Sequence, residues 1–108
     1  MYLKLKVREL KSTMDQNYKK IVMKFGGTSM ADINCINKVA DHIERELSNG
    51  KLIAVVVSAM AGETDRLISL ASQAGINMQQ SERDVIISTG EQVSSAILSM
   101  ILNTRNID

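Results

Sequence analysis

The residues best suited to chemistry in this chain form the segment Lys24–Ser29 (KFGGTS), in which one lysine precedes two adjacent glycines. The segment follows the apolar run Ile21–Met23 and precedes residues with helical periodicity, which predicts a turn between a strand and a helix. Glycine N–H groups allow close approach of a phosphoryl oxygen, and the N-terminus of a helix favours an anion. The segment therefore predicts an anion or phosphate site with one ammonium group, in which Thr28 and Ser29 are placed to cap the helix.

A second glycine-containing corner, Ser58–Thr64 (SAMAGET), follows another apolar run one strand–helix unit later. In a parallel sheet both corners lie at the carboxyl ends of their strands, where open α/β sheets bind ligands. Two such corners at one edge, with the Lys24 ammonium projecting over it, suggest a phosphoryl-transfer site. Neither the Walker pattern nor the Rossmann pattern G-x-G-x-x-G is present. In the Walker pattern the lysine follows the glycines, whereas here it precedes them. The alternative is a tight turn that carries a surface lysine.

Glu91 is a third candidate group. It follows Ser88-Thr89-Gly90, where two hydroxyl residues and a glycine predict a break in an otherwise good helix. A carboxylate delivered by such a break can pair with the ammonium group of a ligand. Alternatively, Glu91 stabilises the first turn of the resumed helix through the helix dipole.

The elements that must position these groups alternate between strand and helix. A short buried strand is expected at Ile21–Lys24, followed by a helix at Ala31–Ser48 that ends at Asn49-Gly50. Leu52–Val57 is a continuous apolar run rich in β-branched residues, which is typical of a central parallel strand covered on both faces. The inward positions expected in the first helix are Ile33, Ile36, Ala40, Ile43 and Leu47.

The second half of the sequence predicts two further helices. One ends at Gly75, and the next opens at Ser81, with Asp84 completing a capping-box pattern three residues later. After the expected break this helix resumes at Gln92 and ends at Asn106, and Ile107 is placed to begin another strand. The apolar positions expected to mark the inward sides of these helices are Leu67, Leu70, Ala71, Ala74, Val93, Ile97, Met100 and Ile101.

Composition restricts the class of protein. The chain has 108 residues, 44% of them hydrophobic, and a net charge of +1, which fits one small soluble domain and gives no electrostatic case for nucleic acid or a membrane surface. Its longest apolar stretch, Leu52–Val57, is too short to span a bilayer. The single cysteine, Cys35, excludes an intrachain disulfide, which fits a cytoplasmic location. His42 lies among charged residues and is expected to be solvated.

Charge divides the chain into two regions. Residues 1–20 carry six basic and two acidic side chains, a net charge of +4, whereas the remainder carries −3. Residues 1–19 are therefore expected to be a poorly ordered basic extension of a domain at 20–108. The extension lacks the apolar core, roughly 7–15 residues long, of a secretory signal. Two or three strands cannot cover the apolar faces of three or four helices, so we expect the domain to be incomplete.

Three motifs, in this order, resemble aspartate kinases of the amino acid kinase superfamily. They are Lys24–Asp32 (KFGGTSMAD), Val55–Asp65 (VVVSAMAGETD) and Ser88–Gln92 (STGEQ), and the resemblance covers residues 20–108. It implies an α/β fold, namely the N-terminal part of the amino acid kinase αβα sandwich, with a mostly parallel sheet built from βα units. It also implies that the nucleotide-binding lobe and the regulatory domains lie outside this sequence. The resemblance favours functional roles for Lys24 and Glu91 over the structural alternatives.

The resemblance implies a reaction as well. An aspartate kinase transfers the γ-phosphoryl group of ATP, which carries Mg²⁺, to the β-carboxylate of L-aspartate, in the pathway to lysine, threonine, methionine and diaminopimelate. Lys24 would neutralise the transferring group, Ser58 would lie near the reacting centre, and Glu91 would pair with the α-ammonium of aspartate. The implied site residues are Lys24, Phe25, Gly26 and Gly27 for the phosphoryl group and Ser58, Thr64 and Glu91 for aspartate.

The resemblance leaves two hypotheses open. The first is an N-terminal fragment of an aspartate kinase that lacks activity on its own. The second is a non-catalytic module that binds aspartate or phosphate weakly, or that packs onto a partner chain, which could be the missing kinase portion.

Overall fold

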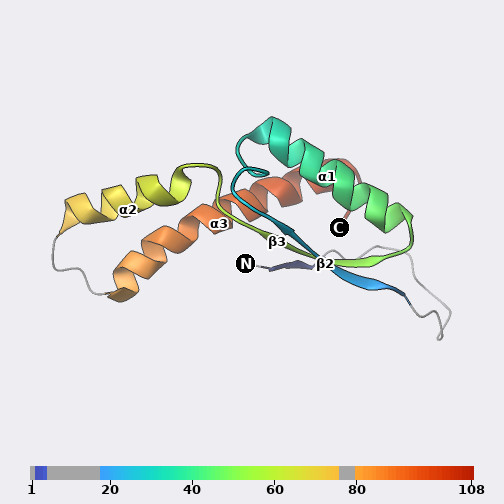
Figure 1. The fold of residues 1–108 in the computed structure, drawn as a ribbon, viewed down its shortest axis with the longest axis horizontal. Coiled ribbons are helices and arrows are strands. Elements are labelled where there is room, and N and C mark those ends of the chain that lie inside the picture. Colours follow the sequence, from blue (N-terminus) through green and yellow to red (C-terminus); the bar gives the residue numbers. More distant parts are fainter. Residues whose placement is uncertain (1, 5–17, 76–79) are drawn as a thin grey trace.

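A computed structural model of the chain describes residues 2–4, 18–75 and 80–108 (Figure 1). Strand β2 (Lys20–Phe25) pairs in parallel with β3 (Leu52–Val57), and β3 also pairs antiparallel with β1 (Tyr2–Lys4). The order β1-β3-β2 makes β3 the central strand, as predicted. The sequence does not predict β1, which lies in the segment expected to be a poorly ordered extension. Residues 5–17 of that segment lie outside the described residues.

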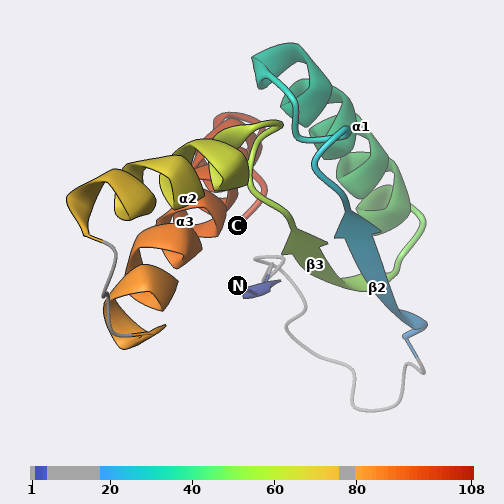
Figure 2. The same ribbon diagram turned by 60° about the vertical axis from the view of Figure 1, so that its left-hand side comes forward.

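Helix α1 (Ile33–Ser48) connects the two parallel strands and packs on one face of the sheet (Figure 2). It ends at Ser48 with Asn49 as the C-cap, and Gly50 then takes a φ of 73°, as the Asn-Gly stop predicts. The predicted cap is wrong: the N-cap is Asp32, whose Oδ1 accepts the N–H of Cys35 at 2.8 Å, and not Thr28 or Ser29. The buried face of α1 consists of Ile36, Val39, Ala40 and Ile43, whereas Ile33, expected to face inward, is 50% exposed.

The sheet is fully buried on one face only. Ile53, Val55 and Val57 of β3 point into the core, while the residues between them are half-buried. On β2, Val22 is 72% exposed, because its side chain lies on the face opposite α1. The predicted coverage of β3 on both faces is therefore wrong for the part of the chain that the structure describes.

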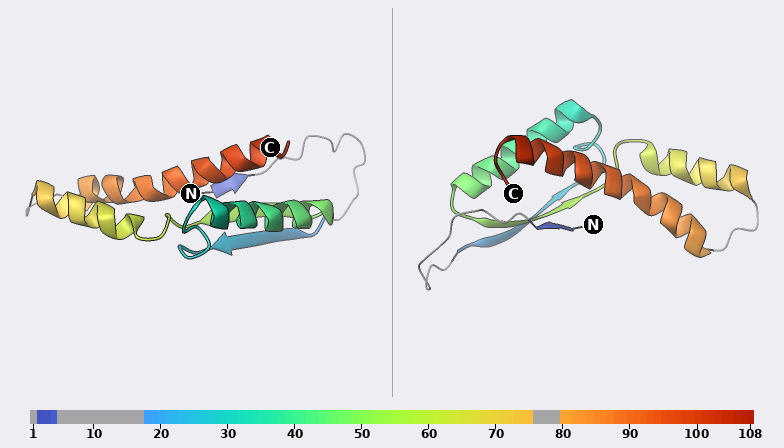
Figure 3. Two further views of the ribbon diagram at one scale, coloured as in Figure 1. Left: turned by 90° about the horizontal axis from the view of Figure 1, so that it is seen from above. Right: turned by 180° about the vertical axis from the view of Figure 1, so that it is seen from behind.

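Helices α2 (Glu63–Ala74) and α3 (Gln80–Thr104) pack against each other and extend beyond the carboxyl ends of the parallel strands (Figures 1 and 3). Leu67 and Ala71 are buried in this contact, but Leu70 is 51% exposed and Ala74 is exposed as well. The capping-box prediction at Ser81 is also wrong. The helix has already begun at Gln80, and the Ser81 hydroxyl donates to Glu82.

Helix α3 is continuous from Gln80 to Thr104, so the predicted break at residues 88–90 is wrong. Its inward face is also rotated from the expected one, because Val93 and Met100 are 49% and 68% exposed. By length and composition alone α3 could cross a membrane, which is weak support for a membrane span, and its inward face contacts α1, α2 and the sheet. The residues buried on that face are Gly90, Ser94, Ser95, Leu98 and Leu102.

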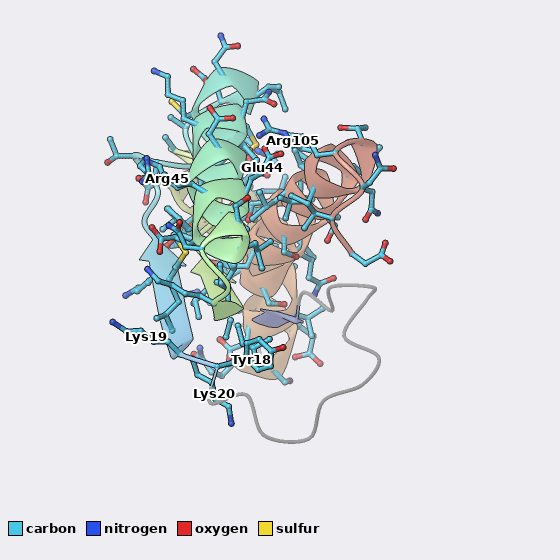
Figure 4. The ribbon with its side chains drawn as sticks, turned by 90° about the vertical axis from the view of Figure 1, so that its right-hand side faces the viewer. Tyr18, Lys19, Lys20, Glu44, Arg45 and Arg105 are labelled. Carbon is cyan, nitrogen blue, oxygen red and sulfur yellow. The ribbon has the colours of Figure 1, made fainter. Side chains whose placement is uncertain are left out.

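The end of α3 is tied to α1 by one arginine. The Arg105 guanidinium donates to Asp41 Oδ1 at 2.7 Å and to Glu44 Oε2 at 3.0 Å, and Figure 4 shows Arg105 beside Glu44. These two carboxylates hold the pKa of Arg105 above its usual range. Asn106 then takes a φ of 59°, which ends the helix as predicted. Ile107 packs against the core and is not part of a strand.

The overall shape is elongated, with principal extents of 57 × 28 × 19 Å. The radius of gyration is 16.8 Å, whereas a compact domain of about this length has about 13 Å. The α2–α3 pair extends past the sheet and contributes to this elongation (Figure 1). This arrangement fits the expectation of an incomplete α/β domain.

Acid should destabilise the chain partly through the cap of α1. The hydrogen bond that the Asp32 carboxylate accepts from the Cys35 N–H, together with one from the Cys35 side chain, lowers the pKa of Asp32. The pKa of Asp32 is lower in the folded chain than in the unfolded chain. Asp32 therefore stabilises the fold at a pH above its unfolded pKa, and this contribution is lost as the pH falls below about 4. Asp32→Asn keeps a capping oxygen but cannot titrate. Urea unfolding between pH 7 and 3 should show a smaller acid-induced loss in Asp32→Asn, and equal losses would contradict this.

Candidate functional site

The turn after β2 holds the first candidate group. Residues 26–30 form this turn, which is closed by the Met30 N–H donating to the carbonyls of Gly26 at 3.2 Å and Gly27 at 3.1 Å. Met30 itself is fully buried, which anchors the turn to the core. The N–H groups of Gly26 and Gly27 have no partner among the described residues, so both can donate to a ligand.

The fold itself does not require glycine at either position. Neither Gly26 nor Gly27 has a positive φ. A Cβ added at Gly26 would meet nothing within 4 Å, and one at Gly27 would lie 3.7 Å from the Ala59 carbonyl oxygen, an ordinary contact. Neither backbone conformation nor crowding within the chain therefore explains the two glycines. Glycine at both positions leaves room for a group outside the chain to approach their N–H groups closely.

Lys24 lies one residue before the end of β2, on the exposed face of the sheet. Its ammonium makes no hydrogen bond or ion pair with any residue that the structure describes. The neighbouring Phe25 points the other way, toward the core. Lys24 thus supplies a free positive charge beside the turn with the two unpaired N–H groups, a combination that suits an anion.

The loop after β3 lies directly against this turn. The Ser58 N–H donates to the Phe25 carbonyl at 3.0 Å, which extends the β2–β3 pairing by one bond. Ser58 is half-buried and the next residue, Ala59, is 3% exposed. The loop ends at Gly62, whose φ of 77° begins α2 and favours glycine at that position. Thr64 follows in the first turn of α2 and is half-buried.

Helix α3 contacts the same loop through two small residues. A Cβ at Gly90 would lie 3.0 Å from the Ala59 Cβ and 3.3 Å from Leu67 Cδ1, so the glycine permits close packing in the middle of the helix. One turn later, the hydroxyl of Ser94 donates to the Ser58 carbonyl at 2.8 Å. Gly90 is therefore explained by packing, and it is not the start of a break that delivers Glu91.

The structure brings three of the predicted motifs into contact. The turn at Gly27, the loop at Ser58 and the α3 segment that carries Glu91 meet through the backbone and side-chain contacts just described. Glu91 is half-buried, and its carboxylate has no partner among the described residues. No hydrogen bond or ion pair within residues 18–75 and 80–108 joins Lys24 or Thr64 to another candidate residue.

Two residues at this junction are not among the site residues predicted from the sequence. Ser94 is fully buried and links α3 to the Ser58 loop, and Ala59 lies between Gly27 and Gly90. The signal that could have found them is the pair of small residues Gly90 and Ser94, four positions apart on one helix face. Within the described residues, no group of three His, Cys, Asp or Glu side chains could hold a metal ion.

Comparison with known proteins identifies the family of the chain. Residues 19–108 match the family model of the amino acid kinase family. The chain belongs to that family.

Within the family, its similarity is to aspartate kinases. It is 48% identical over 87 residues to the aspartate kinase of Stutzerimonas stutzeri and, also over 87 residues, 48% identical to the aspartokinase of Pseudomonas aeruginosa. Each alignment covers 81% of this chain and 21% of the relative. The crystal structure of an aspartate kinase from Synechocystis aligns with a TM-score of 0.74 at 47% identity, covering 77% of this chain and 14% of that one. The chain therefore spans about a fifth of the length of the curated relatives it matches.

Proposed function

We propose that residues 20–108 form the N-terminal, amino-acid-binding part of an aspartate kinase catalytic domain. Its complete form transfers the γ-phosphoryl group of Mg²⁺-ATP to L-aspartate. The similarity to aspartate kinases over 81% of the chain supports the choice of substrate. Because the chain spans about a fifth of those relatives, the remaining kinase portion must come from further sequence on the same chain or from a partner chain.

The observation that carries the proposal is the turn after β2. It combines two adjacent unpaired N–H groups, two glycines that the fold does not require, and the free ammonium of Lys24. Each feature suits the charged oxygens of a transferring phosphoryl group, which must approach the backbone closely. A purely structural turn would not require glycine at these two positions.

The reaction needs charge stabilisation and alignment more than proton transfer. An oxygen of the aspartate β-carboxylate attacks the γ-phosphorus, the bond from that phosphorus to the β,γ-bridging oxygen breaks, and ADP leaves with the electron pair. The carboxylate is already ionised at neutral pH, so no general base is required. Lys24 neutralises the negative charge on the transferring group, while Gly26 and Gly27 donate their N–H groups to its oxygens.

The aspartate substrate requires its own contacts. We assign its α-ammonium to the Glu91 carboxylate, which is half-buried and unpaired among the described residues. Ser58 and Thr64 follow β3 at the same edge and supply hydroxyl groups to hold aspartate near the phosphoryl group. We place the reaction in the cytoplasm, in the pathway from aspartate to lysine and related amino acids, which fits the free thiol of Cys35.

A chimera tests this function. Residues 20–108 would replace the aligned segment of the Pseudomonas aeruginosa aspartokinase, with which the chain shares 48% identity. Release of ADP in a coupled assay with ATP, Mg²⁺ and L-aspartate should stay within about tenfold of the parent enzyme, since the chemical groups are in place. The isolated chain should remain at the rate without enzyme, because the nucleotide lobe is not among its residues.

Two controls keep the test interpretable. The assay without aspartate reports ATP hydrolysis that is unrelated to the proposed transfer. Thermal melting and size-exclusion chromatography of the chimera show whether it folds as the parent does. A folded chimera without aspartate-dependent turnover would overturn the proposed function.

A further inference from the structure

Ser94 places a hydroxyl group at a buried position of α3, where an apolar side chain is usual. Its side chain is fully buried on the inward face of α3, which continues with Leu98 and Leu102. Burying a hydroxyl is costly unless it forms hydrogen bonds, and alanine would fill nearly the same volume. The hydrogen bonds that Ser94 makes therefore indicate what it does.

The Ser94 hydroxyl lies between two carbonyl groups on different elements. Its Oγ is 2.8 Å from the Ser58 carbonyl oxygen in the loop after β3 and 3.1 Å from the Glu91 carbonyl oxygen in α3. A serine in a helix commonly bonds to a carbonyl three or four residues earlier, so the contact with Glu91 is local. The shorter contact with Ser58 joins residues 36 positions apart.

We propose that Ser94 is a positioning residue, whose hydroxyl fixes Ser58 relative to Glu91. This inference rests on the proposed function, in which Ser58 and Glu91 hold the same aspartate molecule from two different elements. The opposite side of the loop is held by the bond from the Ser58 N–H to Phe25. Ser58 is thus held through its N–H to β2 and through its carbonyl to α3, and Gly90 lets the helix approach closely enough for this.

Amide hydrogen exchange on the full 108-residue chain tests the positioning directly. In Ser94→Ala, exchange of the Ser58 amide should accelerate at least about tenfold more than exchange of the Val55 amide, because the loop opens locally while the strand opens only globally. Ser94→Thr retains the hydroxyl and should restore most of the protection. Ser88→Ala is the control, because the Ser88 hydroxyl donates to the Val85 carbonyl at 2.8 Å within the same helix. It should affect the two amides equally.

The outcomes distinguish the inference from general stability effects. Equal acceleration of the Ser58 and Val55 amides in Ser94→Ala, or selective acceleration in Ser88→Ala, would overturn the positioning role. In the aspartokinase chimera, Ser94→Ala should raise KM for aspartate about tenfold and change KM for ATP much less, since ATP does not bridge the two elements. A similar rise in both KM values would also overturn it. If the unmodified chimera is inactive, the proposed function fails, and the exchange rates alone decide whether Ser94 fixes the loop.

Discussion

Lys24→Ala should lower kcat of the aspartokinase chimera by about 10²–10³-fold, the usual effect of removing one group that stabilises transition-state charge. The ammonium of Lys24 has no partner among the described residues, so its loss should leave the free energy of unfolding nearly unchanged. Lys24→Arg keeps the charge but changes the geometry, so it should recover only part of the activity. The measurement is steady-state ADP release, accompanied by thermal melting of each variant.

Lys20→Ala is the matched control for this prediction. Lys20 begins the same strand, lies on the same exposed face as Lys24 by the alternation of exposed and half-buried residues along β2, and is four residues farther from the turn. Its removal changes the net charge equally but should leave kcat within about twofold, since charges at that separation are largely screened. Equal losses in the two variants, or full activity in Lys24→Ala, would remove Lys24 from the site.

The elements next to the site could be predicted because their signals are local. β3 occupies residues 52–57 as expected, since a continuous run of β-branched residues has few alternatives to a buried central strand. α1 begins two residues later than expected because Asp32 forms the cap in preference to the earlier hydroxyl residues. In contrast, β1 depends on pairing with a strand about 50 residues away in sequence, and its three residues carry no periodicity that predicts it.

The course of α3 could not be predicted because tertiary contacts override helix propensity there. Ser88, Thr89 and Gly90 weaken an isolated helix, but Ala59 and Leu67 pack directly against Gly90 and offset that cost. In the middle of α3 the buried positions are glycine and serine, whereas a more apolar residue such as Val93 points outward. A pattern based on hydrophobicity alone therefore selects the wrong face.

The contacts between the motifs could not be predicted from the sequence either. The bond from the Ser58 N–H to Phe25 and the bond from Ser94 to the Ser58 carbonyl both use backbone groups, which every residue carries. The sequence indicates which segments carry chemistry, because lysine, paired glycines and a carboxylate are distinctive. How those segments touch depends on backbone geometry that side-chain types do not specify.

Two glycines of this chain should respond in opposite ways to substitution. Gly27→Ala should leave the free energy of unfolding unchanged or raise it by about 0.4–1 kcal/mol, since the added Cβ makes only an ordinary contact and the unfolded chain loses freedom. In the chimera, the same change should lower kcat about 10²-fold, because the methyl group displaces the phosphoryl group by a fraction of an ångström to an ångström. Urea unfolding and ADP release measure the two effects separately.

Gly90→Val is the contrasting variant, because the space beside Gly90 is already filled by Ala59 and Leu67. The larger side chain should lower the free energy of unfolding by about 2–3 kcal/mol through overpacking. Ala96→Val places the same side chain on the exposed side of the helix and should cost no more than about 0.7 kcal/mol, the difference in helix propensity between alanine and valine. Valine has a higher helix propensity than glycine, so a loss of stability in Gly90→Val must come from packing. If Gly27→Ala were as destabilising as Gly90→Val, the turn after β2 would need its glycine for folding. Gly27 would then be kept for folding and not for a phosphoryl group.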